Sequence, residues 1–319
     1  MVRILSAAFV MGLAIIGAGT ACGQNYPVKP LRILTSEAGA GNDYSARVIA
    51  QGITAPLGQP VIVENRASLI GVEMVAKAPP DGYTLIYVGS SMWILPYMRD
   101  HVPWDSERDF APITVATSAP NILVVYPPLP INSVGDLIAL AKSKPGELNY
   151  AAGATGSAVH LAAELFNAMA GVKIVRIAYK SSAPALIDLT GGRVQIMFST
   201  ANSAMPFVKS AKLRAVAVTS AQPSALFPGL PTVAATGLPG YEMTVLTGMF
   251  APAKTPPAII KRLNEEMVRV LNTAQVKEKF LTQGADTIGS TPEQFAAAIK
   301  VDIAKLSKLI KDAGIRADD

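Results

Sequence analysis

Two glycine-rich turns have the composition and the setting of an anion-binding site. Ala38–Asp43 (AGAGND) and Gly153–Ser157 (GATGS) each lie between a strand-like run and a helix-like run. A turn that leads from a strand into a helix exposes the unpaired N–H groups of that helix, and glycine lets a ligand approach the backbone closely. Such amides bind a carboxylate or a phosphate without any basic side chain. We therefore predict that the two turns are the halves of one anion site.

A pair of turns favours an acid that is held at both ends. A carboxylate gains about 1.5–3 kcal/mol for each charge-assisted hydrogen bond that it accepts. One turn can hold one carboxylate, so two turns across a cleft indicate a diacid or a longer acid. Taken alone, each turn is equally compatible with an ordinary tight connection between a strand and a helix.

The segments around the first turn alternate between β-rich and helical patterns. The predicted strands are Leu31–Thr35, Pro60–Glu64 and Tyr83–Val88, and the predicted helices are Tyr44–Ala55 and Gly71–Ala78. This βαβαβ order predicts a lobe with a parallel sheet.

The pattern restarts after Gly146 and predicts a second α/β lobe. Its strands are Leu148–Ala151, Lys173–Ala178, Val194–Phe198 and Leu213–Thr219, and its helices are Ala158–Met169 and Ala183–Leu189. In open α/β sheets a ligand lies outside the carboxyl ends of the strands, where both glycine turns are found. Lobes that face each other would place both turns at one cleft.

Strand-like segments between the lobes predict a hinge. Ile113–Ala116 and Asn121–Tyr126 lead from the first lobe to the second, and Val245–Ala251 leads back. The predicted division is a leader at 1–23, a first lobe at 24–120 plus 245–319, and a second lobe at 121–244.

The C-terminal part of the chain has a helical pattern. Three helices are predicted, at Pro257–Asn272, Gln275–Gln283 and Pro292–Ala313. The last has Thr291 as its cap and proline as its first residue. We expect these helices to pack on the first lobe.

The first 23 residues have the pattern of a secretory leader, because Arg3 precedes an apolar run that ends in small residues. Two processing routes remain open. Cleavage after Gly23 is favoured over lipidation of Cys22, since a lipoprotein signal prefers Leu where this chain has Gly19. The apolar run is short for a bilayer span. We therefore expect a periplasmic protein.

The composition argues against several classes of site. Cys22 is the only cysteine, so the chain after the leader has no disulfide and no thiolate metal ligand. His101 and His160 are the only histidines. The net charge of +5, which becomes +4 without Arg3, is spread along the chain and forms no basic cluster of the kind that binds nucleic acid. We expect no metal, no cofactor and no nucleic-acid partner.

A dinucleotide site is the sharpest competing interpretation of the first turn. Gly39-Ala40-Gly41 follows a strand, and Glu64 ends the next strand at the distance of a ribose-binding acid. Tyr44, however, occupies the position of the third glycine and would crowd the helix against the strand.

Polar and aromatic side chains are also predicted near the turns. Asp43 is placed as the N-cap of the helix that follows it. Ser90 and Ser91 offer hydroxyls at the end of the third strand, and Trp93 offers a flat wall, although a single Trp in this context is more often part of a core.

An exported hydrolase would need a nucleophile and a base, and Ser157 and His160 are the pair in this sequence that comes closest to meeting that need. No Gly-x-Ser-x-Gly elbow and no phosphate-binding Gly-x-x-x-x-Gly-Lys motif occurs in the sequence. We expect His160 instead to hydrogen bond to the backbone of its loop or to line the pocket, and the chain not to be an enzyme.

Ten short motifs run in order through the chain after the leader: YPxKPLR from Tyr26, GQPV from Gly58, VENR from Val63, PDGYTL from Pro80, DFAPI from Asp109, LNYA from Leu148, GGRV from Gly191, LRAxAVTS from Leu213, LPTV from Leu230 and GLPGY from Gly237. Together these blocks resemble the Bug family, the substrate-binding proteins of tripartite tricarboxylate transporters.

The resemblance implies an α/β, type II periplasmic binding fold whose two lobes close like a Venus flytrap on a small carboxylate. Such a protein delivers its ligand to the membrane subunits of a transporter. In that family, a glycine loop on each lobe holds carboxylates through backbone amides and bound waters. These loops match the two turns here, with His160 at a family-like position, and Tyr179-Lys180 resembles a Tyr-Lys-Gly turn beside the cleft. We expect a monomer.

Departures from the family pattern leave the identity of the ligand open. Glu37 would repel an acid unless it points away or meets a cationic or hydroxyl group of the ligand. Ser181 replaces the usual glycine after Tyr-Lys, and Ser199-Thr200 stands where relatives often carry Asp. A sensor protein that docks on a receptor would show the same sequence features.

The complete predicted ligand-binding set is Glu37, Ala38, Gly39, Ala40, Gly41, Asn42, Asp43, Ser90, Ser91, Trp93, Gly153, Ala154, Thr155, Gly156, Ser157, His160, Tyr179, Ser199 and Asn202.

Overall fold

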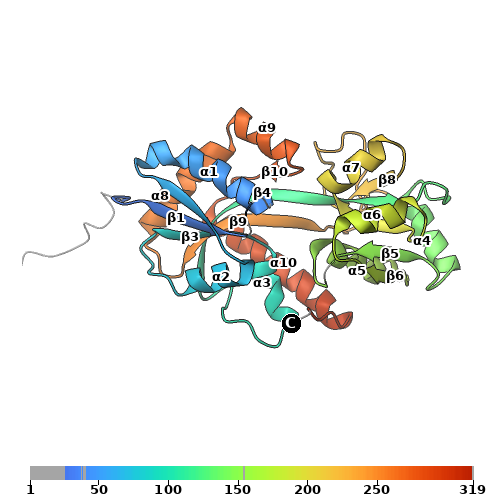
Figure 1. Ribbon diagram of the computed structural model, residues 1–319. Coiled ribbons are helices and arrows are strands. Elements are labelled where there is room, and N and C mark those ends of the chain that lie inside the picture. Colours follow the sequence, from blue (N-terminus) through green and yellow to red (C-terminus); the bar gives the residue numbers. More distant parts are fainter. Residues whose placement is uncertain (1–25, 37, 39–40, 154, 318–319) are drawn as a thin grey trace, which may run out of the picture.

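The structure is a computed structural model that describes residues 26–36, 38, 41–153 and 155–317. The predicted leader at 1–23 lies outside these residues, as do Glu37, Gly39, Ala40 and Ala154 of the predicted ligand-binding set. Two α/β lobes are joined by long strands that run side by side between them (Figure 1).

A parallel sheet forms the first lobe. β1 (Leu31–Thr35) lies between β2 (Val61–Asn65) and β3 (Thr84–Gly89) and pairs in parallel with both. α1 (Gly41–Leu57) and α2 (Ser68–Ala76) connect these strands. β3 is buried along its whole length, as is typical of a parallel strand whose two faces are covered. The predicted βαβαβ lobe is confirmed.

The second lobe repeats this arrangement. β5 (Asn149–Ala152) lies between β6 (Val175–Ala178) and β7 (Ile196–Thr200) and pairs in parallel with both. α5 (Ala158–Ala170) and α6 (Ser182–Thr190) are its helices. The predicted strand near Leu213 is β8 (Arg214–Val218), which pairs antiparallel with β4.

Several elements were not predicted: α3 (Ser91–Ile94), the 3-10 helix η1 (Leu95–Tyr97), α4 (Val134–Ser143), α7 (Ala201–Lys209) and β10 (Asp286–Thr287). α4 carried a readable signal, since Ser133 and Asp136 form a capping box at its start. α7 begins with polar residues and contains Pro206, so its helical pattern is weak.

A single long strand crosses from one lobe to the other. β4 (Phe110–Val125) replaces the two shorter strands predicted at Ile113–Ala116 and Asn121–Tyr126. It pairs with β9 (Thr244–Pro252) as far as Pro120 and with β7 from Asn121 onward. The strand continues past its prolines because the register shifts beside Pro112 and because the pairing with β9 ends at Pro120. The lobe division stays a prediction, which this change of partner supports.

The crossing strands unite both lobes in one sheet. Among the described residues, ten strands form a sheet with the order β2-β1-β3-β9-β4-β7-β5-β6, and β8 and β10 both pair with β4. The predicted hinge therefore stays a prediction, and its strands belong to this sheet.

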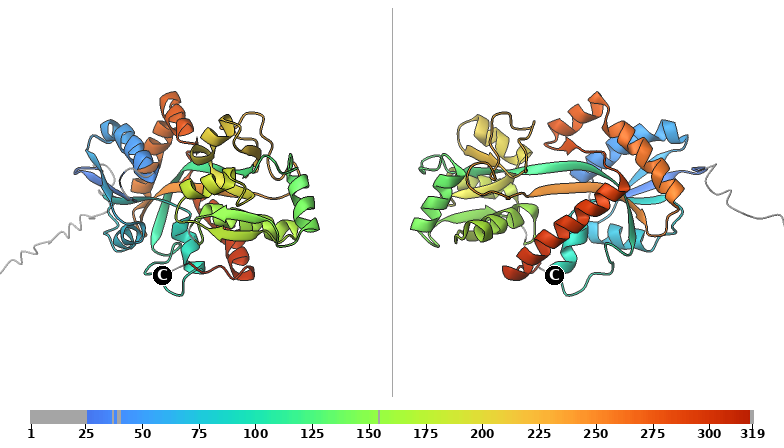
Figure 2. Two further views of the ribbon diagram at one scale, coloured as in Figure 1. Left: turned by 45° about the vertical axis from the view of Figure 1, so that its right-hand side comes forward. Right: turned by 180° about the vertical axis from the view of Figure 1, so that it is seen from behind.

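The C-terminal helices are α8 (Pro257–Leu271), α9 (Ala274–Thr282) and α10 (Pro292–Asp312). α10 begins as predicted, with a capping box between Thr291 and Gln294. The expectation that α10 packs on the first lobe is confirmed by its contacts with α3 and η1, but α10 also contacts α5 of the second lobe. Lys305 on α10 donates a hydrogen bond to the carbonyl of Glu242 in the second lobe at 3.0 Å. Seen from behind, α10 runs diagonally across the junction of the lobes (Figure 2).

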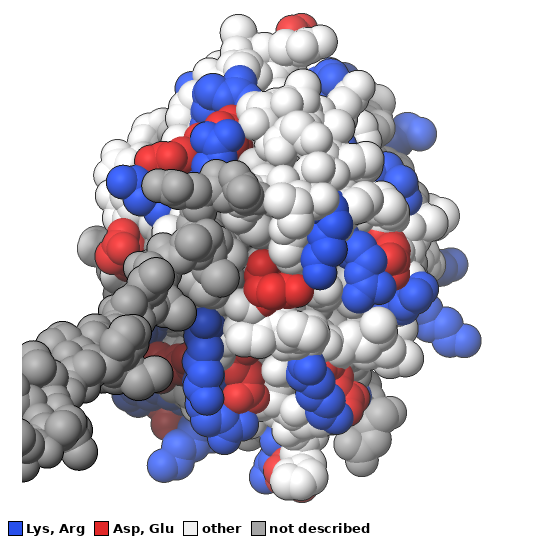
Figure 3. Space-filling model, turned by 90° about the vertical axis from the view of Figure 1, so that its left-hand side faces the viewer, with Lys and Arg blue, Asp and Glu red and all other residues white. Residues whose placement is uncertain are grey.

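The surface carries charges of both signs. On the face of the first lobe that Figure 3 shows, Lys and Arg side chains are interspersed with Asp and Glu.

No helix in the described part of the chain is both long enough and apolar enough to cross a bilayer.

The crossing strands are packed too closely to accept a side chain at Gly248 of β9. A Cβ there would lie 2.5 Å from both the Phe295 ring and the Thr114 carbonyl oxygen. We predict that Gly248→Ala lowers the free energy of unfolding by about 1–3 kcal/mol, because an added methyl group forces side chain or backbone to move.

The matched control is Gly89→Ala on β3, the strand paired with β9. A Cβ at Gly89 meets nothing closer than 3.4 Å. Urea unfolding of both variants measures the difference, and equal stability would contradict this account of the hinge.

Candidate functional site

In both lobes, strands are followed along the chain by helices that begin beyond the carboxyl ends of the strands. β1 precedes α1, β5 precedes α5, and β7 precedes α7. The first N–H groups of each helix have no partner within the helix, and the helix dipole adds a partial positive charge at the same end. The carboxyl ends of these strands therefore present several groups that favour an anion.

A contact across the lobes places the second glycine loop near the first lobe. Met98, the residue after η1, is buried against Gly156. A Cβ on Gly156 would lie 2.3 Å from the Met98 sulfur, and the φ of Gly156 is +76°. Only glycine meets both requirements without strain.

Asn65, at the end of β2, hydrogen bonds to residues on both sides of the first loop. Its amide nitrogen donates to the Ser36 carbonyl at 2.7 Å and to Asp43 Oδ1 at 2.8 Å. Arg47 donates to the same carboxylate oxygen at 2.9 Å. Asn65 thus ties the start of the loop to the first turn of α1.

Asp43 is not the N-cap that the sequence indicated. α1 begins at Gly41, so Asp43 is the third residue of the helix, buried and bonded to Asn65 and Arg47. The helix extends further toward the loop than expected because its glycine and asparagine residues adopt helical conformation. Ala38 and Gly41 are exposed and Asn42 is partly buried, as a ligand-facing loop requires.

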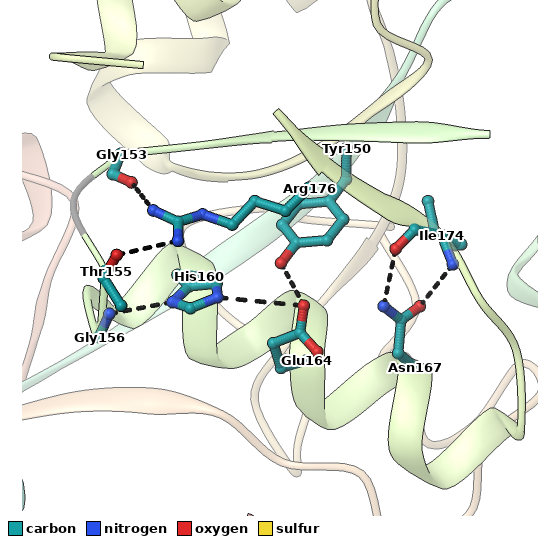
Figure 4. A network of polar contacts seen from close by, with 9 residues as sticks. All are labelled: Tyr150, Gly153, Thr155, Gly156, His160, Glu164, Asn167, Ile174 and Arg176. Atoms are coloured by element: carbon teal, nitrogen blue, oxygen red, sulfur yellow. Dashed lines mark hydrogen bonds and ion pairs between the residues drawn. The ribbon is translucent and has the colours of Figure 1, made fainter. Parts of the chain in front are cut away.

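The second loop is held by Arg176 of β6 and His160 of α5 (Figure 4). The Arg176 guanidinium donates to the Gly153 carbonyl at 2.7 Å and to the Thr155 hydroxyl at 2.9 Å. The Gly156 N–H donates to His160 Nδ1 at 2.9 Å. The expectation that His160 bonds to the backbone of its loop is confirmed.

His160 is a neutral side chain. Burial, with the nearby Arg176 guanidinium as a second cause, lowers its pKa from the ordinary 6.5 to about 4. A neutral ring accepts at Nδ1 and carries its proton on Nε2, which lies 4.0 Å from a Glu164 oxygen. The Tyr150 hydroxyl donates to the same Glu164 oxygen.

The Ser157 hydroxyl does not form a catalytic pair with His160. Its oxygen is buried and has no hydrogen-bond partner among the described residues, while His160 Nδ1 is occupied by Gly156. A nucleophile needs a base within hydrogen-bond reach, so this geometry does not support the hydrolase alternative.

Trp93 is a core residue and presents no wall to the cleft. Its side chain is fully buried, packs on Phe250 and Phe295, and donates from Nε1 to Asp302 on α10 at 2.9 Å. Burial raises the pKa of Asp302. The prediction placed Trp93 at the cleft because this residue follows the end of a strand. In the structure, Trp93 lies in α3 and its side chain is in the core. Ser90 is partly buried and Ser91 is exposed, at the start of the same short helix.

The remaining predicted residues have other contacts. The Tyr179 hydroxyl donates to Asp188 on α6 at 2.9 Å, and the Ser199 hydroxyl is buried and donates to the Thr200 carbonyl at 3.3 Å. Asn202 is exposed at the start of α7 and donates to the Gln283 carbonyl at 2.6 Å. Because Gln283 follows α9, this bond links the two lobes.

Sequence reasoning missed the residues that support the loops. Asn65 was visible only as part of a family-like motif, and Met98 had no signal at all. The sequence does contain a signal for Arg176, because it is a single basic residue inside an otherwise apolar strand, four residues before Lys180. No group of three or more His, Cys, Asp or Glu side chains in the described part of the chain could hold a metal ion.

Comparison with known proteins gives one consistent family. Residues 45–315 match the model described as "Tripartite tricarboxylate transporter family receptor". The protein BugT of Bordetella pertussis is 34% identical over 99% of each chain. The solved structure of R. palustris Rpa4515 with adipate is 34% identical, has a TM-score of 0.75, and covers 91% of this chain and 99% of its own. MatC of Rhodopseudomonas palustris with bound malate is 25% identical, with a TM-score of 0.71 over 89% of this chain and all of its own.

The neutral state of His160 predicts a specific pH dependence of stability. The folded protein binds fewer protons at His160 than the unfolded chain between pH 6.5 and about 4. We therefore predict that the free energy of unfolding falls as the pH falls through this window. His160→Asn, which keeps an acceptor near the Nδ1 position, should reduce the slope.

Urea unfolding at a series of pH values gives the measurement, with His101→Asn as the control because His101 is exposed. An unchanged slope in His160→Asn would show that the protonation of this ring is not coupled to folding.

Proposed function

The chain belongs to the tripartite tricarboxylate transporter receptor family, and from this premise we propose that it is a periplasmic solute-binding protein that captures a small carboxylate between its lobes. It delivers this ligand to the membrane subunits of a tripartite tricarboxylate-type transporter. It does not turn the ligand over.

The observation that carries the proposal is the pair of strand-to-helix connections, one in each lobe, with side chains of neighbouring elements hydrogen bonded to each. Asn65 holds the first loop and Arg176 and His160 hold the second. Asn65 and Arg176 donate to oxygens of the loops and of Asp43, whereas His160 accepts from the Gly156 N–H. We propose that the amides in the first turns of α1 and α5 bind the ligand. A carboxylate satisfies such amides better than a neutral group does.

Related proteins support the choice of a carboxylate. Rpa4515 was solved with adipate and MatC with malate. Both ligands carry two carboxylates, and a diacid can contact one loop of each lobe. We propose a dicarboxylate or an aromatic acid as the ligand of this chain.

Closure follows from differential affinity. A ligand shifts the equilibrium between open and closed lobes only if it binds the closed form better. An acid can contact both loops only when the lobes are close together. The contact of its second carboxylate is therefore gained in the closed form and stabilises that form. β4 and β9 connect the lobes at 120/121 and 244/245, where we propose the hinge.

A thermal-shift screen tests the proposed function. The purified protein is compared with and without adipate, malate, citrate, benzoate, glutamate and glucose. An acid at about a hundred times its Kd should stabilise the protein by about 2.7 kcal/mol. A shift for particular acids supports the proposal, and a shift for glucose alone, or for none of the six, contradicts it.

Gly156 gives a sharper prediction at the same site. Gly156→Ala adds a methyl group at a positive φ and against Met98, so the strained loop, the Met98 side chain or both must shift. We predict that the affinity for the acid found in the screen falls about tenfold or more, which is the loss of one charge-assisted hydrogen bond.

Gly146→Ala is the matched control, measured by the same calorimetric titration. Gly146 has a φ of +78°, so the strain is similar, but no atom lies within 4 Å of its added methyl group. It precedes β5 at the end of the sheet away from the loop. If both variants bind the acid as tightly as the unsubstituted protein, the second loop is not part of the site.

A further inference from the structure

Arg176 reaches the second loop from the edge of the sheet. β6 places it beside Tyr150 of β5, on the face that α5 covers. Its side chain runs past the Tyr150 ring to the loop, where the guanidinium lies above His160 (Figure 4). An extended arginine is long enough to link the edge strand to a loop at the end of the neighbouring strand.

The hydrogen bonds of Arg176 engage two oxygens of the second loop. The Gly153 carbonyl and the Thr155 hydroxyl both accept from the guanidinium, at 2.7 and 2.9 Å. Oxygen lone pairs that faced a bound carboxylate would repel it. Because they are turned toward Arg176, the loop is preorganised for an anion rather than for a cation or a neutral donor.

The charge of Arg176 is not neutralised by the protein. Among the residues that the structure describes, no Asp or Glu carboxylate lies within 4.0 Å of its guanidinium, and its Nε is buried without a hydrogen-bond partner. Glu164, on the adjoining helix, is instead bonded to Tyr150. Arg176 as a whole is partly buried, and an anion bound close to its guanidinium would offset the cost of withdrawing this charge from water.

We propose that Arg176 is the specificity-determining positioning residue of the second loop: it holds the loop through Gly153 and Thr155 and supplies the positive charge that makes this half of the site select a carboxylate over a neutral group. This inference rests on the proposed function and assigns the selection to one side chain. A merely structural arginine would hold the loop but would not discriminate between charged and neutral ligands.

Three substitutions separate charge from geometry. Arg176→Gln removes the charge, Arg176→Lys keeps the charge but loses the two-pronged contact, and Thr155→Val removes one acceptor. Lys142→Gln is the control, because it removes one positive charge from an exposed position on α4 of the same lobe. Calorimetric titration with adipate, malate and the neutral analogue adipamide measures each affinity.

We expect Arg176→Gln to weaken the binding of the dicarboxylates by about tenfold or more, as is typical for loss of a charge-assisted contact, with little effect on adipamide. Arg176→Lys should retain part of the preference for acid over amide, and Lys142→Gln all of it. A second readout does not depend on any ligand. Because the guanidinium lowers the pKa of His160, NMR titration of the imidazole should show a higher pKa in Arg176→Gln.

The outcomes distinguish this inference from the proposed function. If the unsubstituted protein binds an acid and Arg176→Gln binds it equally tightly, the inference fails and the proposed function stands. An equal loss for acid and amide assigns Arg176 a structural role only and also overturns the inference. If the unsubstituted protein binds no acid of the panel, both fail. If Arg176→Gln does not fold, the inference is decided by comparing Arg176→Lys with Thr155→Val. Only the inference predicts that the lysine variant prefers acid over amide more strongly.

Discussion

Backbone amides at the start of a helix attract an anion only if something else fixes the loop that carries them. A glycine-rich turn is conformationally free, and free amides gain little from a ligand that must first order them. In this protein, side chains of neighbouring elements hydrogen bond to residues in or beside the two turns. Asn65 holds the loop before α1, and Arg176 and His160 hold the loop before α5. Asn65 and Arg176 donate to oxygens, and His160 accepts from the Gly156 N–H.

The same constraint explains why the lobes are connected through their sheet. A ligand that touches one loop of each lobe requires both loops to keep their shape while the distance between them changes. β4 pairs with β9 in the first lobe and with β7 in the second, so one continuous strand joins the lobes, and we propose that bending occurs where its partner changes. α10 spans the junction, and the contacts between Met98 and Gly156 and between Asn202 and Gln283 join the lobes on their facing sides.

The sequence was sufficient for most of the strands and helices around the two turns but not for the side chains that support these turns. Period-two and period-3.6 patterns identified β1, β3, α5 and α10 closely, because apolar burial determines those patterns. Family-like motifs then placed the turns in a binding protein. Trp93 was assigned to the cleft because a pattern gives the position of a residue along a strand or helix but not the direction of its side chain in three dimensions. Arg176 and Asn65 were missed for the same reason, since each acts on a loop that is distant in sequence.

The central claim is that backbone amides of both lobes hold the two ends of one acid. It is tested most directly by a crystal structure of the protein with the most stabilising dicarboxylate. The account predicts one carboxylate within hydrogen-bond distance of the N–H groups at the start of α1 and the other at the start of α5, with the Arg176 guanidinium still bonded to Gly153. An acid that contacts one lobe only, or that is held by side chains away from both loops, would contradict it.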